Sequence, residues 1–181
     1  EKRKIITGVT YTMDKRQIKF FDEQREKLQN NLEKKIPGVE VAISDLSKDE
    51  TKAIVISYSD KSRGTYYYYD IEDDTLLKLA DLSPWINDEY MSEMKPISYT
   101  SRDGLTIHGY LTIPVGSDGK NLPVIINPHG GPWARDYWGF NSEIQFFANR
   151  GYAVLQMNFR GSVGYGREFW EISFKEWGKT M

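Results

Sequence analysis

The sequence lacks several residue types and patterns, and each absence excludes a class of function. Cysteine is missing from all 181 residues, which excludes disulfides, thiolate metal sites and a cysteine nucleophile. Every apolar run is far shorter than the roughly 20 residues that span a bilayer, and no signal-peptide segment follows the start. We therefore expect a soluble chain with no membrane partner. Its compartment stays open between the cytoplasm and the periplasm, because many proteins of either lack cysteine.

The chain also lacks a large excess of either charge, and histidine is scarce. The 24 basic and 26 acidic residues nearly cancel to a net charge of −2, and both signs are interspersed, so nucleic acid is offered no basic face. Histidine occurs twice, at His108 and His129, with no aspartate, glutamate or cysteine at ligand spacing. We therefore expect no nucleic-acid partner, no metal and no cofactor.

The first half of the chain is predicted to contain one helix and a four-stranded meander. Apolar side chains on one helical face predict a helix over residues 19–36, with Asp22 as its N-cap and Pro37 after its end. That face comprises Phe21, Leu28, Leu32 and Ile36. Four strand-like segments separated by polar turns follow at residues 39–45, 53–58, 65–71 and 75–80. A meander of this spacing, over residues 39–80, is typical of a propeller blade or one sheet of a sandwich.

A change of pattern follows a linker that we place at residues 82–94, and we set the domain boundary between residues 95 and 96. Beyond a hairpin joined through Asp103-Gly104, strands and helices alternate. Strands are predicted at residues 124–128 and 152–158, and helices at residues 142–150 and 167–177. A buried strand, a helix and another buried strand predict a βαβ unit of a parallel sheet, with its functional loops at the carboxyl ends of the strands.

The most informative motif is His129-Gly130-Gly131-Pro132, directly after the first of these strands. A glycine pair at a strand end can present bare backbone N–H groups, which acyl-transfer enzymes use to hold a developing oxyanion. The simpler interpretation is a tight turn without catalytic duty, but the position in a βαβ unit favours the oxyanion loop. We expect His129 to shape this loop, and not to act as a triad base.

A second glycine-rich loop, residues 158–166, follows the next strand. Its glycines, Gly161, Gly164 and Gly166, match neither the phosphate loop nor the dinucleotide fingerprint. We expect a strand-to-helix turn in which Arg160 pairs with a buried carboxylate or with carbonyls. Ser162 is not expected to be a nucleophile, because arginine stands where the first glycine of a nucleophile elbow is needed. No complete Gly-x-Ser-x-Gly occurs in the chain.

Three segments, residues 129–136, 151–156 and 158–166, strongly resemble the prolyl oligopeptidase family of serine peptidases, in its acylaminoacyl-peptidase-like and dipeptidyl-aminopeptidase-like branch. The resemblance implies that residues 1–95 are the last part of a β-propeller. Residues 96–181 would be the N-terminal half of an α/β-hydrolase domain, a partly parallel sheet with flanking helices. The fold class is thus mixed, an all-β blade remnant followed by half of an α/β domain.

The resemblance also implies roles for single residues. The Gly131 N–H would be one oxyanion donor, on a loop supported by His129, Gly130 and Pro132. The serine elbow, the acid and the base histidine of the triad would lie beyond Met181.

The function implied is that of a serine peptidase that cuts short peptides through an acyl-enzyme. This chain alone would supply only part of the oxyanion hole, and we expect it to be inactive. An acyl esterase of the same fold and a noncatalytic scaffold remain as alternatives. Apolar faces left uncovered by an incomplete sheet also favour self-association.

Overall fold

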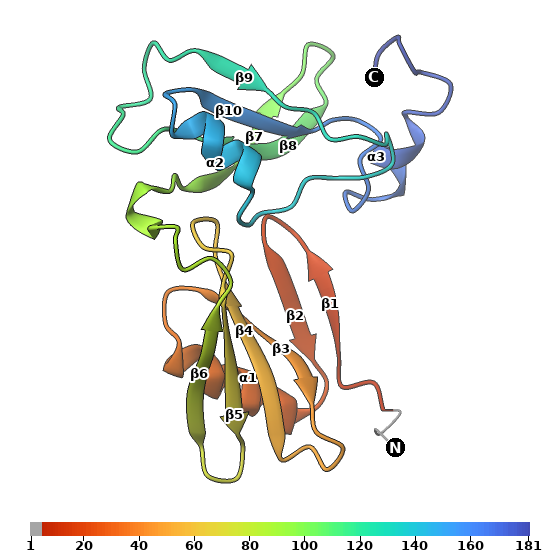
Figure 1. The fold of residues 1–181 in the computed structure, drawn as a ribbon. Helices are drawn as coiled ribbons and strands as arrows, with labels where there is room; N and C mark the ends of the chain where they lie inside the picture. Colours follow the sequence, from red (N-terminus) through yellow and green to blue (C-terminus); the bar gives the residue numbers. More distant parts are fainter. Residues whose placement is uncertain (1–4) are drawn as a thin grey trace. The chain divides into compact units, whose positions relative to one another are not determined.

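Three sheets account for the strands of residues 5–181, the part of the chain that the computed structural model describes (Figure 1). Two compact units hold them. The first comprises the chain up to Tyr11 together with Gln17–Glu89. The second comprises Thr12–Arg16, the tip of a hairpin, together with Tyr90–Met181.

The predicted meander is confirmed in the first unit. Its four strands pair antiparallel in chain order, so that each strand neighbours the next one along the sequence. The strands are β3 (Glu40–Leu46), β4 (Lys52–Tyr58), β5 (Thr65–Asp70) and β6 (Thr75–Asp81). In β4 buried residues alternate with partly buried ones, as expected for a sheet with one face on a core.

The helix α1 (Glu23–Lys35) supplies the other side of that core (Figure 1). Asp22 is its N-cap, as predicted, and its carboxylate accepts a hydrogen bond of 2.9 Å from the Arg25 N–H. The helix packs on β3. The side chains buried between the helix and the sheet are Leu32, Ile36, Val41, Ala53, Val55 and Tyr69.

The prediction of a helix over residues 19–36 was wrong at its start. Residues 19 and 20 belong to β2 (Arg16–Phe20), which pairs with β1 (Gly8–Thr12) in a hairpin. Phe21 was wrongly assigned to the buried helical face, since it precedes the helix and is 61% exposed. The hydrophobic periodicity continues across the junction between β2 and α1, and in the sequence only the N-cap residue Asp22 marks that junction.

The second unit contains a sheet of mixed direction. The strands β7 (Met94–Thr100) and β8 (Thr106–Thr112) form the predicted hairpin, and β8 pairs antiparallel with β10 (Ala153–Asn158). On its other side β10 pairs in parallel with β9 (Val124–Ile126).

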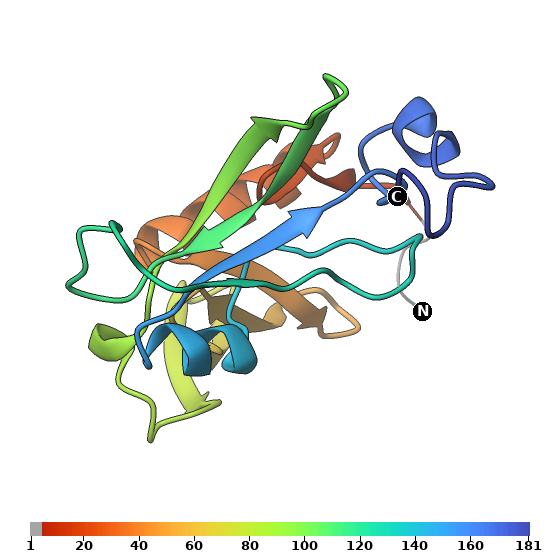
Figure 2. The same cartoon turned by 90° about the horizontal axis from the view of Figure 1, so that it is seen from above.

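The connection between these parallel strands contains α2 (Ser142–Ala148), which packs on β10 (Figure 2). Asn141 caps the helix by accepting hydrogen bonds from the Glu143 and Ile144 N–H groups. The predicted βαβ unit is therefore present.

Two details of the second unit differ from the predictions. The strand β9 was expected to be buried, but Val124 and Ile126 are 56% and 52% exposed, because β9 has β10 as its one partner among the strands of residues 5–181. The helix expected over residues 167–177 ends at Glu171 as α3 (Arg167–Glu171). Ile172 is its C-cap, the Ser173 hydroxyl donates to the Trp170 carbonyl, and Lys175 has a left-handed conformation that a continuing helix would not allow.

Leu32→Ala tests the core of the first unit. The side chain is fully buried against the sheet, so we expect the free energy of unfolding to fall by about 2–5 kcal/mol. Leu77→Ala is the matched control, because Leu77 is 58% exposed and its loss should change stability by less than about 0.5 kcal/mol. Urea unfolding measures both, and equal effects would contradict this account of the core.

Candidate functional site

Two loops meet at one end of the mixed sheet. Residues 127–138 leave β9 and residues 159–166 leave β10, and because these strands are parallel, both loops start at the same edge (Figure 1). A backbone hydrogen bond of 3.0 Å from the Val163 N–H to the Ala134 carbonyl joins them. Both glycine-rich motifs therefore belong to one site.

His129 connects the two loops through both of its ring nitrogens. Its Nδ1 lies 2.8 Å from the Gly130 carbonyl oxygen, and its Nε2 lies 2.7 Å from the Ser162 hydroxyl oxygen. The ring also stacks on Phe159, with centroids 4.4 Å apart and planes 14° apart. The expectation that His129 shapes the loop agrees with these contacts, and both nitrogens are engaged.

Ser162 is fully buried in the turn after β10. Its hydroxyl donates to the Phe159 carbonyl at 2.6 Å, and its N–H donates to the same carbonyl at 2.9 Å. A nucleophile must reach its substrate. The burial of Ser162 therefore supports the view that it is a structural residue of the turn.

Gly131 presents a free backbone donor in this site. It is exposed, and no hydrogen bond from its N–H occurs within residues 5–181. Its φ of +141° favours glycine, and a Cβ at this position would lie 2.8 Å from the Trp133 nitrogen. The peptide bond to Pro132 is cis. The geometry thus offers a backbone N–H without a partner among the described residues, on the loop that leaves β9.

Asn158 ties the first loop to the end of β10. Its side-chain oxygen Oδ1 accepts a hydrogen bond of 2.7 Å from the Asp136 N–H. Its side-chain nitrogen Nδ2 donates to the Asp136 carbonyl at 3.2 Å and to the Tyr165 hydroxyl at 2.7 Å. Asn158 is fully buried. Burial raises the pKa of the Asp136 carboxyl, while His129, a hydrogen bond from Gln156 and Arg135 act to lower it.

Arg135 is the charged group at the centre of the site. It is 7% exposed and donates to the Asp136 carbonyl at 3.1 Å, to the Tyr165 hydroxyl at 2.8 Å and to the Met13 carbonyl at 3.1 Å. Its guanidinium also lies 4.4 Å from the centroid of the Tyr165 ring. Burial raises the pKa of the Tyr165 hydroxyl in spite of this positive charge. Arg135 therefore fixes the first loop to two other parts of the unit, the second loop and the hairpin tip.

The second loop is held by Arg160 and its glycines. Arg160 pairs with Asp103 at 2.6 Å, so the predicted carboxylate partner exists, but Asp103 is half exposed and not buried. Gly161 and Gly164 have positive φ, and a Cβ on them would lie 2.5 Å from Ser173 and 2.9 Å from Arg135. Gly166, also with positive φ, is the N-cap of α3. Close packing thus explains two of the three glycines.

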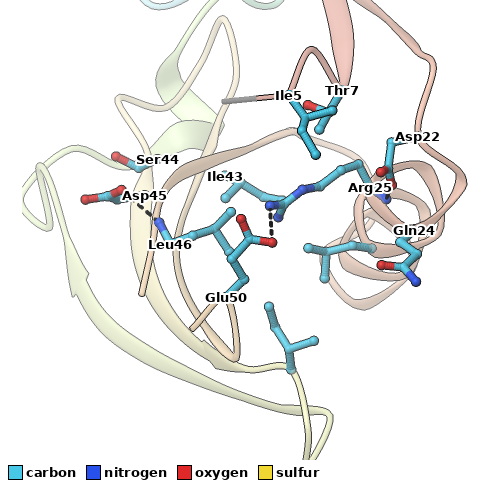
Figure 3. A pocket seen from close by; sticks show the side chains of 12 residues that line it. Ile5, Thr7, Asp22, Gln24, Arg25, Ile43, Ser44, Asp45, Leu46 and Glu50 are labelled. Atoms are coloured by element: carbon cyan, nitrogen blue, oxygen red, sulfur yellow. Dashed lines mark hydrogen bonds and ion pairs between the residues drawn. The ribbon is translucent and has the colours of Figure 1, made fainter. Parts of the chain in front are cut away.

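The pocket drawn in Figure 3, about 460 Å³, lies within the first unit and does not include these loops. Arg25 reaches from α1 toward Glu50, with 2.9 Å between Nη2 and Oε2, and the side chains of Ile43 and Leu46 line the wall (Figure 3). No histidine is among the described residues that line it. Among the described lining residues the pocket therefore offers one ion pair and no histidine base.

Other site types find no support in residues 5–181. No group of three or more histidine, aspartate or glutamate side chains there could hold a metal ion. None of the helices in that part of the chain is both long and apolar enough to cross a bilayer.

Sequence reasoning missed three residues that organise the site, Asn158, Arg135 and Asp136. Asn158 ends a buried strand, where an apolar residue would satisfy the strand pattern, and a buried amide needs partners. That position was a usable signal. Nothing in the local pattern reveals the contact of Arg135 with Met13, which are 122 residues apart.

Comparison with known proteins identifies relatives of this chain. Residues 138–181 match the model of the prolyl oligopeptidase family. The chain is 37% identical over 152 residues to dipeptidyl aminopeptidase BIII of Pseudoxanthomonas mexicana, covering 80% of this chain and 22% of that protein. It is 30% identical over 167 residues to dipeptidyl peptidase family member 6 of Caenorhabditis elegans, with the same two coverages, 80% and 22%.

Solved structures give the same relationship. An acylaminoacyl peptidase of Pyrococcus horikoshii superposes with a TM-score of 0.57 at 27% identity, over 76% of this chain and 22% of that one. A puromycin-hydrolyzing peptidase of Mycobacterium tuberculosis gives 0.59 at 25% identity, over 72% and 21%. The chain spans about a fifth of the length of the relatives named here.

Asp103→Asn tests whether the ion pair between Asp103 and Arg160, here called the clamp, stabilises the second loop, because this stabilisation should depend on pH. Hydrogen bonding by Ser101, and then pairing with Arg160, lower the pKa of the Asp103 carboxyl to about 2. Its unfolded value is about 3.9, so the stabilisation is complete above that pH and is lost as the pH falls toward 2. The variant should therefore lose less stability between pH 4 and pH 2 than the parent protein.

Urea midpoints at pH 6, 4 and 2.5 measure this difference. Asp118→Asn is the matched control, because Asp118 makes no ion pair within residues 5–181 and should keep the parent's acid sensitivity. An Asp103→Asn variant with the parent's full acid sensitivity would show that the clamp does not contribute.

Proposed function

Because this chain belongs to the prolyl oligopeptidase family, we propose that it is part of a serine peptidase that hydrolyses short peptides through an acyl-enzyme. The relatives support this class of reaction, since their names describe a dipeptidyl aminopeptidase, an acylaminoacyl peptidase and a puromycin-hydrolyzing peptidase. A short peptide is accordingly the proposed substrate.

The observation that carries the proposal is the free N–H of Gly131. It is exposed, lacks a partner within residues 5–181 and lies on the loop that leaves a parallel strand of the sheet. In acyl transfer, such a donor stabilises the negative charge that forms on the carbonyl oxygen of the substrate in the transition state. His129, Gly130 and Pro132 support the loop, and a second donor would come from the residue after the nucleophile.

The remaining machinery is proposed to lie beyond Met181. The chain contains no Gly-x-Ser-x-Gly, the hydroxyl of Ser162 is buried, and both ring nitrogens of His129 are engaged. A nucleophile must reach its substrate, and Ser162 is fully buried. We therefore propose that this chain alone does not form an acyl-enzyme.

The two halves of the chain receive separate roles in this proposal. Residues 1–95 would be the C-terminal part of a β-propeller, in which β3–β6 form one blade. Residues 96–181 would be the N-terminal half of the α/β-hydrolase domain. Exposed aromatic side chains of the second half, Trp133, Phe174 and Trp177, support the further proposal that the isolated chain self-associates.

Fluorophosphonate labelling tests the proposed reaction. The full-length protein should be labelled at one serine beyond Met181, and the 181-residue chain should not be labelled. Peptidyl-amide and short-chain acyl-ester substrates then separate the reaction classes. Esterolysis without amide cleavage across a peptide panel would favour an acyl esterase, and an unlabelled full-length protein would favour a scaffold.

Gly131→Ala in the full-length protein tests the donor itself. The methyl group would meet the Trp133 nitrogen and the positive φ disfavours it, so the loop must shift. We expect kcat to fall by roughly 10²–10³-fold, as for the loss of one oxyanion donor. Gly130→Ala is the matched comparison, because nothing lies within 4 Å of its Cβ, and we expect a much smaller loss. Equal losses would contradict a specific role of Gly131.

A further inference from the structure

The Gly131 N–H is half of a peptide group whose other half is the Gly130 carbonyl. Because the peptide bond is planar and trans, this N–H and this carbonyl point in opposite directions from one plane. Rotating the plane turns both groups together. Any contact that fixes the direction of the Gly130 carbonyl therefore also fixes the direction of the Gly131 N–H.

This peptide plane needs such a contact, because glycine stands on both sides of it. Glycine has no Cβ to restrict rotation, and a Cβ on Gly130 would find nothing within 4 Å. The Gly131 N–H has no partner within residues 5–181 that would hold the plane from its other end. Among residues 5–181, the contact that holds this peptide group is on the carbonyl, where His129 Nδ1 lies 2.8 Å from the oxygen.

The direction of that hydrogen bond follows from its acceptor. A carbonyl oxygen only accepts, so His129 Nδ1 must carry the hydrogen. The other ring nitrogen, Nε2, lies 2.7 Å from the Ser162 hydroxyl oxygen, and the hydrogen of that hydroxyl is donated to the Phe159 carbonyl. Contacts at both nitrogens therefore hold the imidazole between Gly130 and Ser162.

The ring is itself held in place from a second loop. Ser162 is fully buried, and its N–H and hydroxyl contact the Phe159 carbonyl, which fixes the turn after β10. The Phe159 ring stacks on the imidazole, 4.4 Å between centroids. A hydrogen bond at Nε2 and a stacked face leave the ring little freedom. The position of Nδ1 is thus determined by the loop after β10.

We propose that His129 is a positioning residue of the oxyanion hole: Ser162 and Phe159 hold its imidazole, and the imidazole aims the Gly131 N–H by holding the Gly130 carbonyl. This inference rests on the proposed function, since it names the device that orients the donor of that reaction. It gives the histidine of the motif a role other than that of a base. It also gives Ser162 a role other than that of a nucleophile.

Asparagine and glutamine separate the two contacts of His129. The amide nitrogen of asparagine is as many bonds from Cβ as Nδ1, so His129→Asn can still donate to the Gly130 carbonyl. The amide nitrogen of glutamine is as many bonds from Cβ as Nε2, so His129→Gln can reach Ser162 but replaces the Nδ1 contact with a methylene group. A role in aiming the peptide predicts that asparagine substitutes for histidine and that glutamine does not.

The experiment measures kcat and KM of the full-length protein on a peptidyl amide for the parent, His129→Asn, His129→Gln and His129→Ala. We expect kcat to fall by about 10–100-fold in the glutamine and alanine variants and by less than about 3-fold in the asparagine variant. KM should change little in all of them, because the donor acts on the transition state. Equal losses of kcat in the three variants would overturn the proposal.

Crystal structures of the same variants give a readout that does not depend on activity. The Gly130 carbonyl should keep its direction in His129→Asn and rotate in His129→Gln and His129→Ala. An unmoved carbonyl in the alanine variant would overturn the proposal even if kcat fell. An inactive parent protein would contradict the proposed function, and the carbonyl directions would still decide whether His129 holds the peptide.

Discussion

The site depends on the parallel pairing of β9 with β10. This pairing sets Val124 opposite Ala153 and Ile126 opposite Leu155, and so it brings the ends of two strands that are separated by a helix to one edge of the sheet. From that edge the His129 loop and the Ser162 loop extend side by side. The hydrogen bonds between the loops, and the exposed Gly131 N–H, all follow from this register.

The loops after β9 and β10 are packed around buried polar side chains. Asn158, Arg135 and Ser162 are each buried and hydrogen-bonded to backbone groups of the loops. A buried polar group that loses its partner costs about 1–3 kcal/mol, so such a network tolerates few loop conformations. In the proposed function, this network would hold the loop that carries the Gly131 N–H before substrate binds.

The sequence was sufficient to predict the meander, the βαβ unit and the position of the Gly131 loop, because these follow from local hydrophobic periodicity and from glycine at a strand end. Periodicity failed where a long-range neighbour decides the outcome. The exposure of β9 depends on which strand pairs beside it. The contact of His129 with Ser162 joins residues 33 apart and required the register of the sheet.

The central claim is that the Gly131 N–H holds the oxyanion of an acyl-transfer reaction. A crystal structure of the full-length protein with a fluorophosphonate bound to its nucleophilic serine tests it most directly, because the phosphoryl oxygen of the adduct occupies the oxyanion position. The account predicts that this oxygen lies about 2.7–3.1 Å from the Gly131 nitrogen. An adduct oxygen held by other donors, beyond hydrogen-bond reach of Gly131, would contradict it.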